Sequence, residues 1–351
     1  MEKADRNPVL DGMMGLCVGD ALGVPVEFMS REVLQTVPVL DMRGYGTHHQ
    51  PPGTWSDDTS MTICLAESLT RCSLSKGLDY GDIMNNFRKW YNDGEFTPYG
   101  EVFDVGISTG AALNRFLHGV TPLACGGTGE RDNGNGSLMR ILPLLFYLQA
   151  VYGTDFTEQK NGSSSLNAEE EAFAIIHNVS ALTHGHKRSK LACGIYLCVA
   201  SQLTEAKAMK HKTVSGVPEL KTAVEKGVRQ ALAYYQKHSA FQDELISFAR
   251  LMEDDFARLD ERAIKSSGYV VDTLEAALWC LFQTHSYQEC VLQAVNLGGD
   301  TDTVAAVAGG LAGLYYGYEQ IPEEWLATIA QRPYLEELCH KLHSSLYLLQ
   351  L

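Results

Sequence analysis

Apolar residues recur at helical spacing in nearly every long segment of this 351-residue chain. Ile83, Phe87, Trp90 and Tyr91, for example, follow the three- and four-residue steps that place side chains on one face of a helix. The alternation of apolar and polar residues that is typical of strands is scarce. The pattern therefore predicts an all-α fold.

The segments that share this periodicity are residues 8–23, 58–72, 79–92, 106–118, 137–151, 168–182, 187–208, 218–237, 240–257, 271–284, 287–296, 302–317 and 334–349. No repeat of fixed period is present, which argues against a solenoid. Two polar stretches, 153–167 and 207–218, are typical of surface loops, and neither is long enough to establish a domain boundary. We expect residues 1–351 to form a single compact orthogonal helical bundle.

The charge balance narrows the classes of partner. The chain carries 28 basic and 43 acidic residues, a formal net charge of −15 without a basic stripe, so it does not favour nucleic acid or an anionic membrane as a partner. The longest apolar run, 304–318, is too short and too rich in glycine and alanine to span a bilayer. Nine cysteines without a CxxC pair and an N-terminus without a secretory pattern predict reduced thiols and a cytoplasmic location.

Two short segments place paired carboxylates at expected helix starts. The first, GTWSDDTSM, contains Asp57 and Asp58, and taken alone it would be explained as a helix cap with acidic residues that complement the helix dipole. The second, GGDTDT, repeats the arrangement with Asp300 and Asp302. Four carboxylates with flanking hydroxyls provide the oxygen ligands that hard cations such as Mg²⁺ prefer, with Mn²⁺ as an alternative.

Three further segments are candidates for ligand binding. In GDALGVPVEF a helix breaks into a loop that carries Glu27, although the segment alone is also a plain helix C-terminus. In NGNGSLMR the glycines permit close approach of a ligand, and Ser137 is expected to open a helix whose first turn holds a phosphate. In LTHGH no carboxylate or cysteine accompanies His184 at metal-ligand spacing, so it is interpreted as a ligand-lining or core histidine.

These five motifs, in the order GDALGVPVEF, GTWSDDTSM, NGNGSLMR, LTHGH and GGDTDT, resemble the ADP-ribosylglycohydrolase family over roughly residues 10–315. The resemblance implies an all-α bundle with two Mg²⁺ ions in a central cleft, acting on ADP-ribosyl-arginine, ADP-ribosyl-serine or O-acetyl-ADP-ribose. Relatives commonly carry threonine before the first aspartate pair, where this chain has Ser56 and so keeps the hydroxyl.

The same resemblance assigns roles to individual residues. The implied metal ligands are Ser56, Asp57, Asp58, Asp300, Asp302 and Thr303. The implied substrate-binding residues are Glu27, Asn135, Gly136, Ser137, His184 and Gly299. The expected catalytic carboxylates are Asp302, Asp57 and Glu27, and the choice of general base among them stays open. Two metals would orient the ribose hydroxyls and activate a water molecule, while the bond at C1″ breaks with oxocarbenium character.

The substrate is predicted from the loop at residues 24–27, which resembles that of the dinitrogenase-reductase-type members. It favours N-glycosidic ADP-ribosyl-arginine on a modified protein as the substrate. The alternatives are O-linked ADP-ribose, on serine or in O-acetyl-ADP-ribose, and a phosphoester, which the same ligand set also supports. A rival of another class is a binding or immunity protein that neutralises a cognate ADP-ribosyltransferase by contact.

Overall fold

The computed structural model describes residues 7–157, 168–211 and 219–347, and within these ranges the chain forms helices and no β-strand. The α-helices are α1 (Pro8–Gly23), α2 (Arg31–Thr36), α3 (Asp57–Arg71), α4 (Tyr80–Asp93), α5 (Ile107–Leu117), α6 (Pro143–Tyr152), α7 (Ala168–Ala181), α8 (Lys187–His211), α9 (Leu220–Gln236), α10 (Val270–Gln283), α11 (Tyr287–Asn296), α12 (Thr301–Tyr316), α13 (Glu323–Thr328) and α14 (Arg332–Tyr347). The predicted all-α fold is confirmed.

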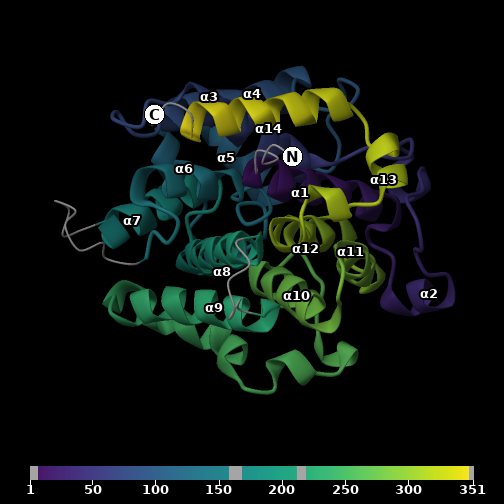
Figure 1. The fold of residues 1–351 in the computed structure, drawn as a ribbon. Coiled ribbons are helices and arrows are strands. Elements are labelled where there is room, and N and C mark those ends of the chain that lie inside the picture. The colour runs from purple at the N-terminus through teal and green to yellow at the C-terminus, as the bar shows by residue number, and fades with distance from the viewer. Residues whose placement is uncertain (1–6, 158–167, 212–218, 348–351) are drawn as a thin grey trace.

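Helices α1 and α12 pack against each other at the centre of the bundle (Figure 1). Helices α14, α3 and α4 lie on one side of this pair, and α8, α10 and then α9 lie on the other (Figure 1). The segment Pro8–Val26 is long and apolar enough to cross a membrane. It is 94% buried inside the protein, as is typical of a core helix. All nine cysteines are free, and eight of them are buried, in agreement with the expectation of reduced thiols.

Glycines allow α1 and α12 to touch along their backbones. A Cβ atom added to Gly15 would lie 2.4 Å from the carbonyl oxygen of Gly309, and one added to Gly19 would lie 2.2 Å from that of Ala305. Both distances are too short for a side chain, so the two helices approach as closely as their main chains permit. This contact places the C-terminal end of α1 beside the N-terminal end of α12.

The substitution Gly309→Val tests this helix contact. A Cβ on Gly309 would lie 2.3 Å from the Gly15 carbonyl oxygen. We expect the free energy of unfolding to fall by about 2–4 kcal/mol, measured by chemical denaturation, because the helices must separate. Gly110→Ala in α5 is the control, since an added Cβ meets no atom closer than 3.7 Å there and alanine favours helix. Unchanged stability of Gly309→Val would contradict the contact.

Several expected boundaries are wrong. The helix predicted to open at Ser137 begins at Pro143, because residues 137–142 form turns before it. The expected helix 240–257 is a 3-10 segment over Ser239–Met252 followed by a second short 3-10 helix, Phe256–Arg258. Residues 207–211 belong to α8 instead of a loop. The short helices α2 and α13 are too brief for periodicity to reveal. The predicted loop residues 158–167 and 212–218 lie outside the described residues.

Candidate active site

Asp20, in the last turn of α1, organises one edge of the site. Its carboxylate is fully buried and accepts hydrogen bonds from the backbone N and Oγ of Ser56 and from the backbone N and Oγ1 of Thr59, at 2.6 to 3.1 Å. The first turn of α3 is therefore fastened to the end of α1. From its sequence alone this stretch is a helix C-terminus, and Asp20 is not among the predicted site residues.

The two predicted aspartate pairs meet across the bundle because α3 and α12 both begin beside the end of α1. Carboxylate oxygens of Asp20, Asp58 and Asp302 lie within 4.8 Å of one another. Thr303 Oγ1 donates to Asp58 Oδ2 at 3.2 Å, and Ser56 Oγ, whose single proton is donated to Asp20, lies 3.1 Å from the same oxygen. Residues from opposite ends of the chain thus form one acidic cluster.

A second group shares Asp302 with the first. Oxygens of Glu27, Asp300 and Asp302 also lie within 4.8 Å of one another. Backbone pairing brings Glu27 here, since Phe28 N donates to the Gly299 carbonyl at 2.7 Å and Gly299 N donates to Met29 O at 2.8 Å. Gly299 has φ +76, and a Cβ there would lie 2.4 Å from the Ser266 carbonyl oxygen. Gly299 therefore shapes the turn that presents Asp300.

A third group consists of Glu27, His48 and Asp104. His48 Nε2 and Glu27 Oε2 form a short hydrogen bond, and Thr47 Oγ1 donates to the Glu27 carbonyl oxygen at 2.8 Å. The backbone of Asp104 is left-handed, with φ +51. Neither His48 nor Asp104 was predicted, because neither belongs to the motifs selected from the sequence. His48 ends a three-residue 3-10 helix, and Asp104 lies in irregular chain.

The site concentrates negative charge in a region of low exposure. Burial raises the pKa of Asp20 to about 6 and that of Glu27 to about 7. Burial, followed by repulsion from neighbouring carboxylates, raises the pKa values of Asp57, Asp58 and Asp302 well above the ordinary range. Within the described residues, the only ion-pair partner of these five carboxylates is His48, which pairs with Glu27.

The donor set suits a hard divalent cation. Asp58 Oδ1 and Asp302 Oδ2 are buried and have no hydrogen-bond partner within the described residues. Buried charged oxygens without a partner are costly, and a cation would satisfy both of them and offset the repulsion among the carboxylates. Oxygen ligands without cysteine are typical of Mg²⁺ or Mn²⁺ sites. Asp57 is 5% exposed and lies outside the three groups, although its pKa is raised by burial and next by the charges of Asp104 and Asp58.

The NGNGS loop connects this cluster to His184. Asn135 Nδ2 donates to Asp300 Oδ2 at 2.7 Å and to Thr273 Oγ1 at 2.9 Å. A Cβ added to Gly136 would lie 2.8 Å from His184 Cε1, so glycine allows the imidazole to approach the loop. The Ser137 hydroxyl is buried and bonded to Ser180 Oγ at 3.0 Å, so its side chain packs inward.

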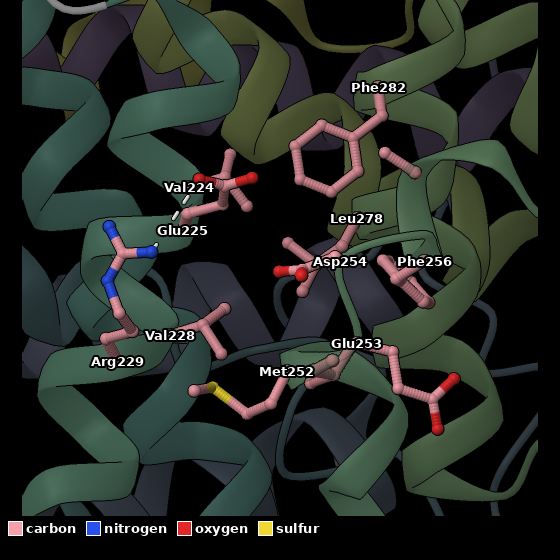
Figure 2. Close-up of a pocket in the computed structure, with 12 residues that line it drawn as sticks. Val224, Glu225, Val228, Arg229, Met252, Glu253, Asp254, Phe256, Leu278 and Phe282 are labelled. Carbon is pink, nitrogen blue, oxygen red and sulfur yellow. Dashed lines mark ion pairs between the residues drawn. The ribbon is translucent and has the colours of Figure 1, made fainter.

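A separate pocket lies between α9, α10 and the chain near residue 254 (Figure 2). Val228, Phe256 and Phe282 provide apolar walls, and Glu225 pairs with Arg229 at 3.6 Å on its rim (Figure 2). None of the predicted site residues lines it. The acidic cluster is therefore distinct from this pocket.

Comparison with known proteins agrees with this geometry. Residues 1–350 match the family model described as ADP-ribosylglycohydrolase. The chain belongs to the ADP-ribosylglycohydrolase family. The resemblance deduced from the five motifs is confirmed, and the family identifies the chain as a glycohydrolase that acts on ADP-ribose.

Individual relatives of this glycohydrolase differ in their named activities. It is 32% identical to the ADP-ribosylarginine hydrolase Tri1 of Serratia proteamaculans (strain 568), over 94% of this chain and 77% of that protein. It is 31% identical to the ADP-ribosyl-[dinitrogen reductase] glycohydrolase of Rhodospirillum rubrum, over 91% and 89%, and 26% identical to ADP-ribosylhydrolase ARH3 of Danio rerio, over 96% and 89%. A solved ADP-ribosylglycohydrolase-related protein complex matches with TM-score 0.70 and 30% identity, over 97% of this chain and 98% of the solved chain.

Proposed function

We propose that this glycohydrolase uses divalent cations to release ADP-ribose from modified arginine side chains of proteins. One observation carries the metal-dependent part: two carboxylate groups share Asp302 and contain buried oxygens without hydrogen-bond partners. The arginine linkage is supported by the similarity to an ADP-ribosylarginine hydrolase, at 32% identity over 94% of the chain.

The proposed metal site comprises Asp20, Glu27, Asp58, Asp300 and Asp302, and the predicted ligand Asp57 lies outside it. Mg²⁺ or Mn²⁺ would be held by Asp58, Asp300 and Asp302, with the hydroxyls of Ser56 and Thr303 beside them. Bound divalent cations supply Lewis acidity toward water and toward the ribose hydroxyls. The residues themselves position these oxygens before substrate arrives, because hydrogen bonds between α1, α3 and α12 fix their carboxylates.

The proposed proton acceptor is one of the three carboxylates predicted to be catalytic. Asp302 and Glu27 each belong to two of the carboxylate groups, whereas Asp57 belongs to none. This placement supports Asp57 as the general base, because its oxygens are not required for the groups that would hold the cations. For Glu27, which precedes the left-handed Phe28, the proposed role is contact with the distal ribose.

Release of ADP-ribose from an ADP-ribosyl-arginine protein and from an ADP-ribosyl-serine peptide tests this proposal. Each substrate is incubated with Mg²⁺, with Mn²⁺ and with EDTA, and free ADP-ribose is quantified by chromatography. We expect release from arginine with either metal and none with EDTA, because without a cation the site lacks the Lewis acid that orients the ribose hydroxyls and lowers the pKa of the attacking water.

The other outcomes distinguish the alternatives. Release from serine alone would support the proposed metal site but would contradict the arginine linkage. The similarity to ARH3, at 26% identity, is the reason for including the serine peptide. If as much ADP-ribose is released in EDTA as in Mg²⁺, the proposed dependence on a divalent cation is wrong. No release from either substrate would favour a protein that binds or blocks an ADP-ribosyltransferase.

A further inference from the structure

Burial of the Arg140 guanidinium is energetically unfavourable. Arg140 is fully buried, and within the described residues only Nη2 donates hydrogen bonds, to the Val179 carbonyl at 3.2 Å and to Thr183 Oγ1 at 2.8 Å. Nε and Nη1 have no hydrogen-bond partner within the described residues, although the guanidinium lies 4.7 Å from the centre of the Phe87 ring. A buried cation with two unpaired nitrogens destabilises a fold, so its presence indicates a role beyond packing.

The hydroxyl of Thr183 is hydrogen-bonded to both Arg140 and His184. Thr183 Oγ1 and His184 Nδ1 are 2.8 Å apart. A guanidinium can only donate, so Thr183 Oγ1 accepts from Arg140. Among the described residues, His184 Nδ1 is the one other side-chain atom hydrogen-bonded to this hydroxyl, so it receives the single hydroxyl proton of Thr183. His184 Nδ1 is therefore the acceptor in this bond.

An imidazole that accepts at Nδ1 and is neutral carries its proton on Nε2. Burial, and next the nearby charge of Arg140, lower the pKa of His184 to about 3, so the ring stays neutral at physiological pH. Among the described residues, His184 Nε2 has no hydrogen-bond partner. It lies 3.4 Å from the position that a Cβ atom on Gly134 would occupy. The Nε2–H is thus available beside the NGNGS loop.

A second polar group points to the same place. Thr109 Oγ1 is buried without a hydrogen-bond partner in the described part of the chain, and it lies 2.9 Å from the position of a Cβ on Gly136. His184 Cε1 lies 2.8 Å from that position. Asn135, in the same loop as Gly134 and Gly136, connects this loop to the acidic cluster through its hydrogen bond to Asp300. His184 Nε2 and Thr109 Oγ1, two polar atoms without a hydrogen-bond partner in the described residues, therefore lie beside the loop that contacts the proposed metal site.

We infer that Arg140 and Thr183 are positioning residues that hold His184 in its Nε2–H tautomer, as a neutral donor to an acceptor oxygen of the ADP-ribosyl group. The identity of this ligand rests on the proposed function, whereas the tautomer does not. The oxygen belongs to the pyrophosphate or to a ribose hydroxyl, which share this chemistry. A donor without charge binds such an oxygen and does not repel the cations proposed at the neighbouring carboxylates.

Nitrogen-15 NMR of the histidine rings tests the tautomer directly. The His184 signals are identified as those lost in His184→Gln. In the wild-type protein between about pH 5 and pH 8 we expect an unprotonated Nδ1 and a protonated Nε2. Thr183→Val should abolish this preference, and Thr183→Ser, which keeps the hydroxyl, should preserve it. A protonated Nδ1 in the wild-type protein, or a Thr183→Val ring identical to wild type, would overturn the inference.

Calorimetric binding of ADP-ribose and of ADP, both with Mg²⁺, tests the role of the donor. We expect Thr183→Val to bind ADP-ribose about tenfold or more weakly than wild type, and Thr183→Ser to remain within about threefold. An equal loss for ADP would identify the pyrophosphate as acceptor, and a loss confined to ADP-ribose would identify the distal ribose. Unchanged affinity of a folded Thr183→Val protein would refute the ligand role.

These measurements separate the inference from the proposed function. A wild-type protein that releases no ADP-ribose from arginine but shows the Nε2–H tautomer and the Thr183→Val binding loss would contradict only the proposed function. An active enzyme with the other tautomer would contradict only the inference. Thermal unfolding of each variant confirms that the compared proteins are folded.

Discussion

Asp302→Asn is expected to lower kcat for ADP-ribose release by at least about 10³-fold. Asp302 is fully buried, belongs to both carboxylate groups, and has one oxygen without a partner in the described residues. Asparagine retains the oxygen that accepts from Thr303 N at 2.9 Å but removes the negative charge, so the turn is kept while the proposed cation loses its shared ligand. Turnover is measured at saturating substrate with excess Mg²⁺.

The same substitution should stabilise the protein in EDTA. Burial and repulsion from Glu27 and Asp58 raise the pKa of Asp302, which means that its ionised form opposes folding when no cation is bound. We therefore expect a higher melting temperature than wild type in EDTA and a smaller increase on adding Mg²⁺. Asp243→Asn, at an exposed position outside the site, is the control and should match wild type in every measurement. Near-normal turnover, or an undiminished response to Mg²⁺, would refute the central role of Asp302.

The predictable part of the site is the part carried by local sequence. The pairs at Asp57 and at Asp300 each combine two carboxylates with a helix start, a pattern that remains visible without the fold. The close contact of α1 with α12 then unites them, and small residues such as Gly309 permit that contact. Family resemblance added Glu27, whose position depends on backbone pairing with Gly299.

The residues that escaped prediction depend on tertiary structure. Asp20 lies in an apolar helix where a single carboxylate indicates nothing until Ser56 and Thr59 are seen to donate to it. Asp104 and His48 belong to segments without periodicity. Ser137 was expected to open a helix, but the turns after the NGNGS loop delay the helix until Pro143. Such turns are set by contacts of the loop with distant residues, including Asn135 with Asp300.

Glu27→Gln should remove part of the pH dependence of stability in EDTA. Burial, with added repulsion from Asp104 and Asp300, raises the pKa of Glu27 from 4.5 to about 7 in spite of its bond to His48. A carboxylate whose pKa is higher in the folded state contributes nothing below its unfolded pKa. It costs stability progressively as the pH rises through the folded value, because the folded protein then binds more protons than the unfolded chain. Wild type in EDTA should thus lose on the order of 1–3 kcal/mol from this group between pH 4.5 and 7.

Glu275→Gln provides a matched control for this prediction. Burial raises the pKa of Glu275 to about 7 as well, but this residue pairs with Arg250 at 2.9 Å and belongs to none of the carboxylate groups. Denaturation at pH 5 and pH 8 should therefore show a flatter pH dependence in EDTA for both variants. Only Glu27→Gln should also weaken the stabilisation by Mg²⁺, which in wild type grows with pH because cations bind ionised carboxylates. If the two variants respond equally to Mg²⁺, Glu27 does not contribute to the cation site.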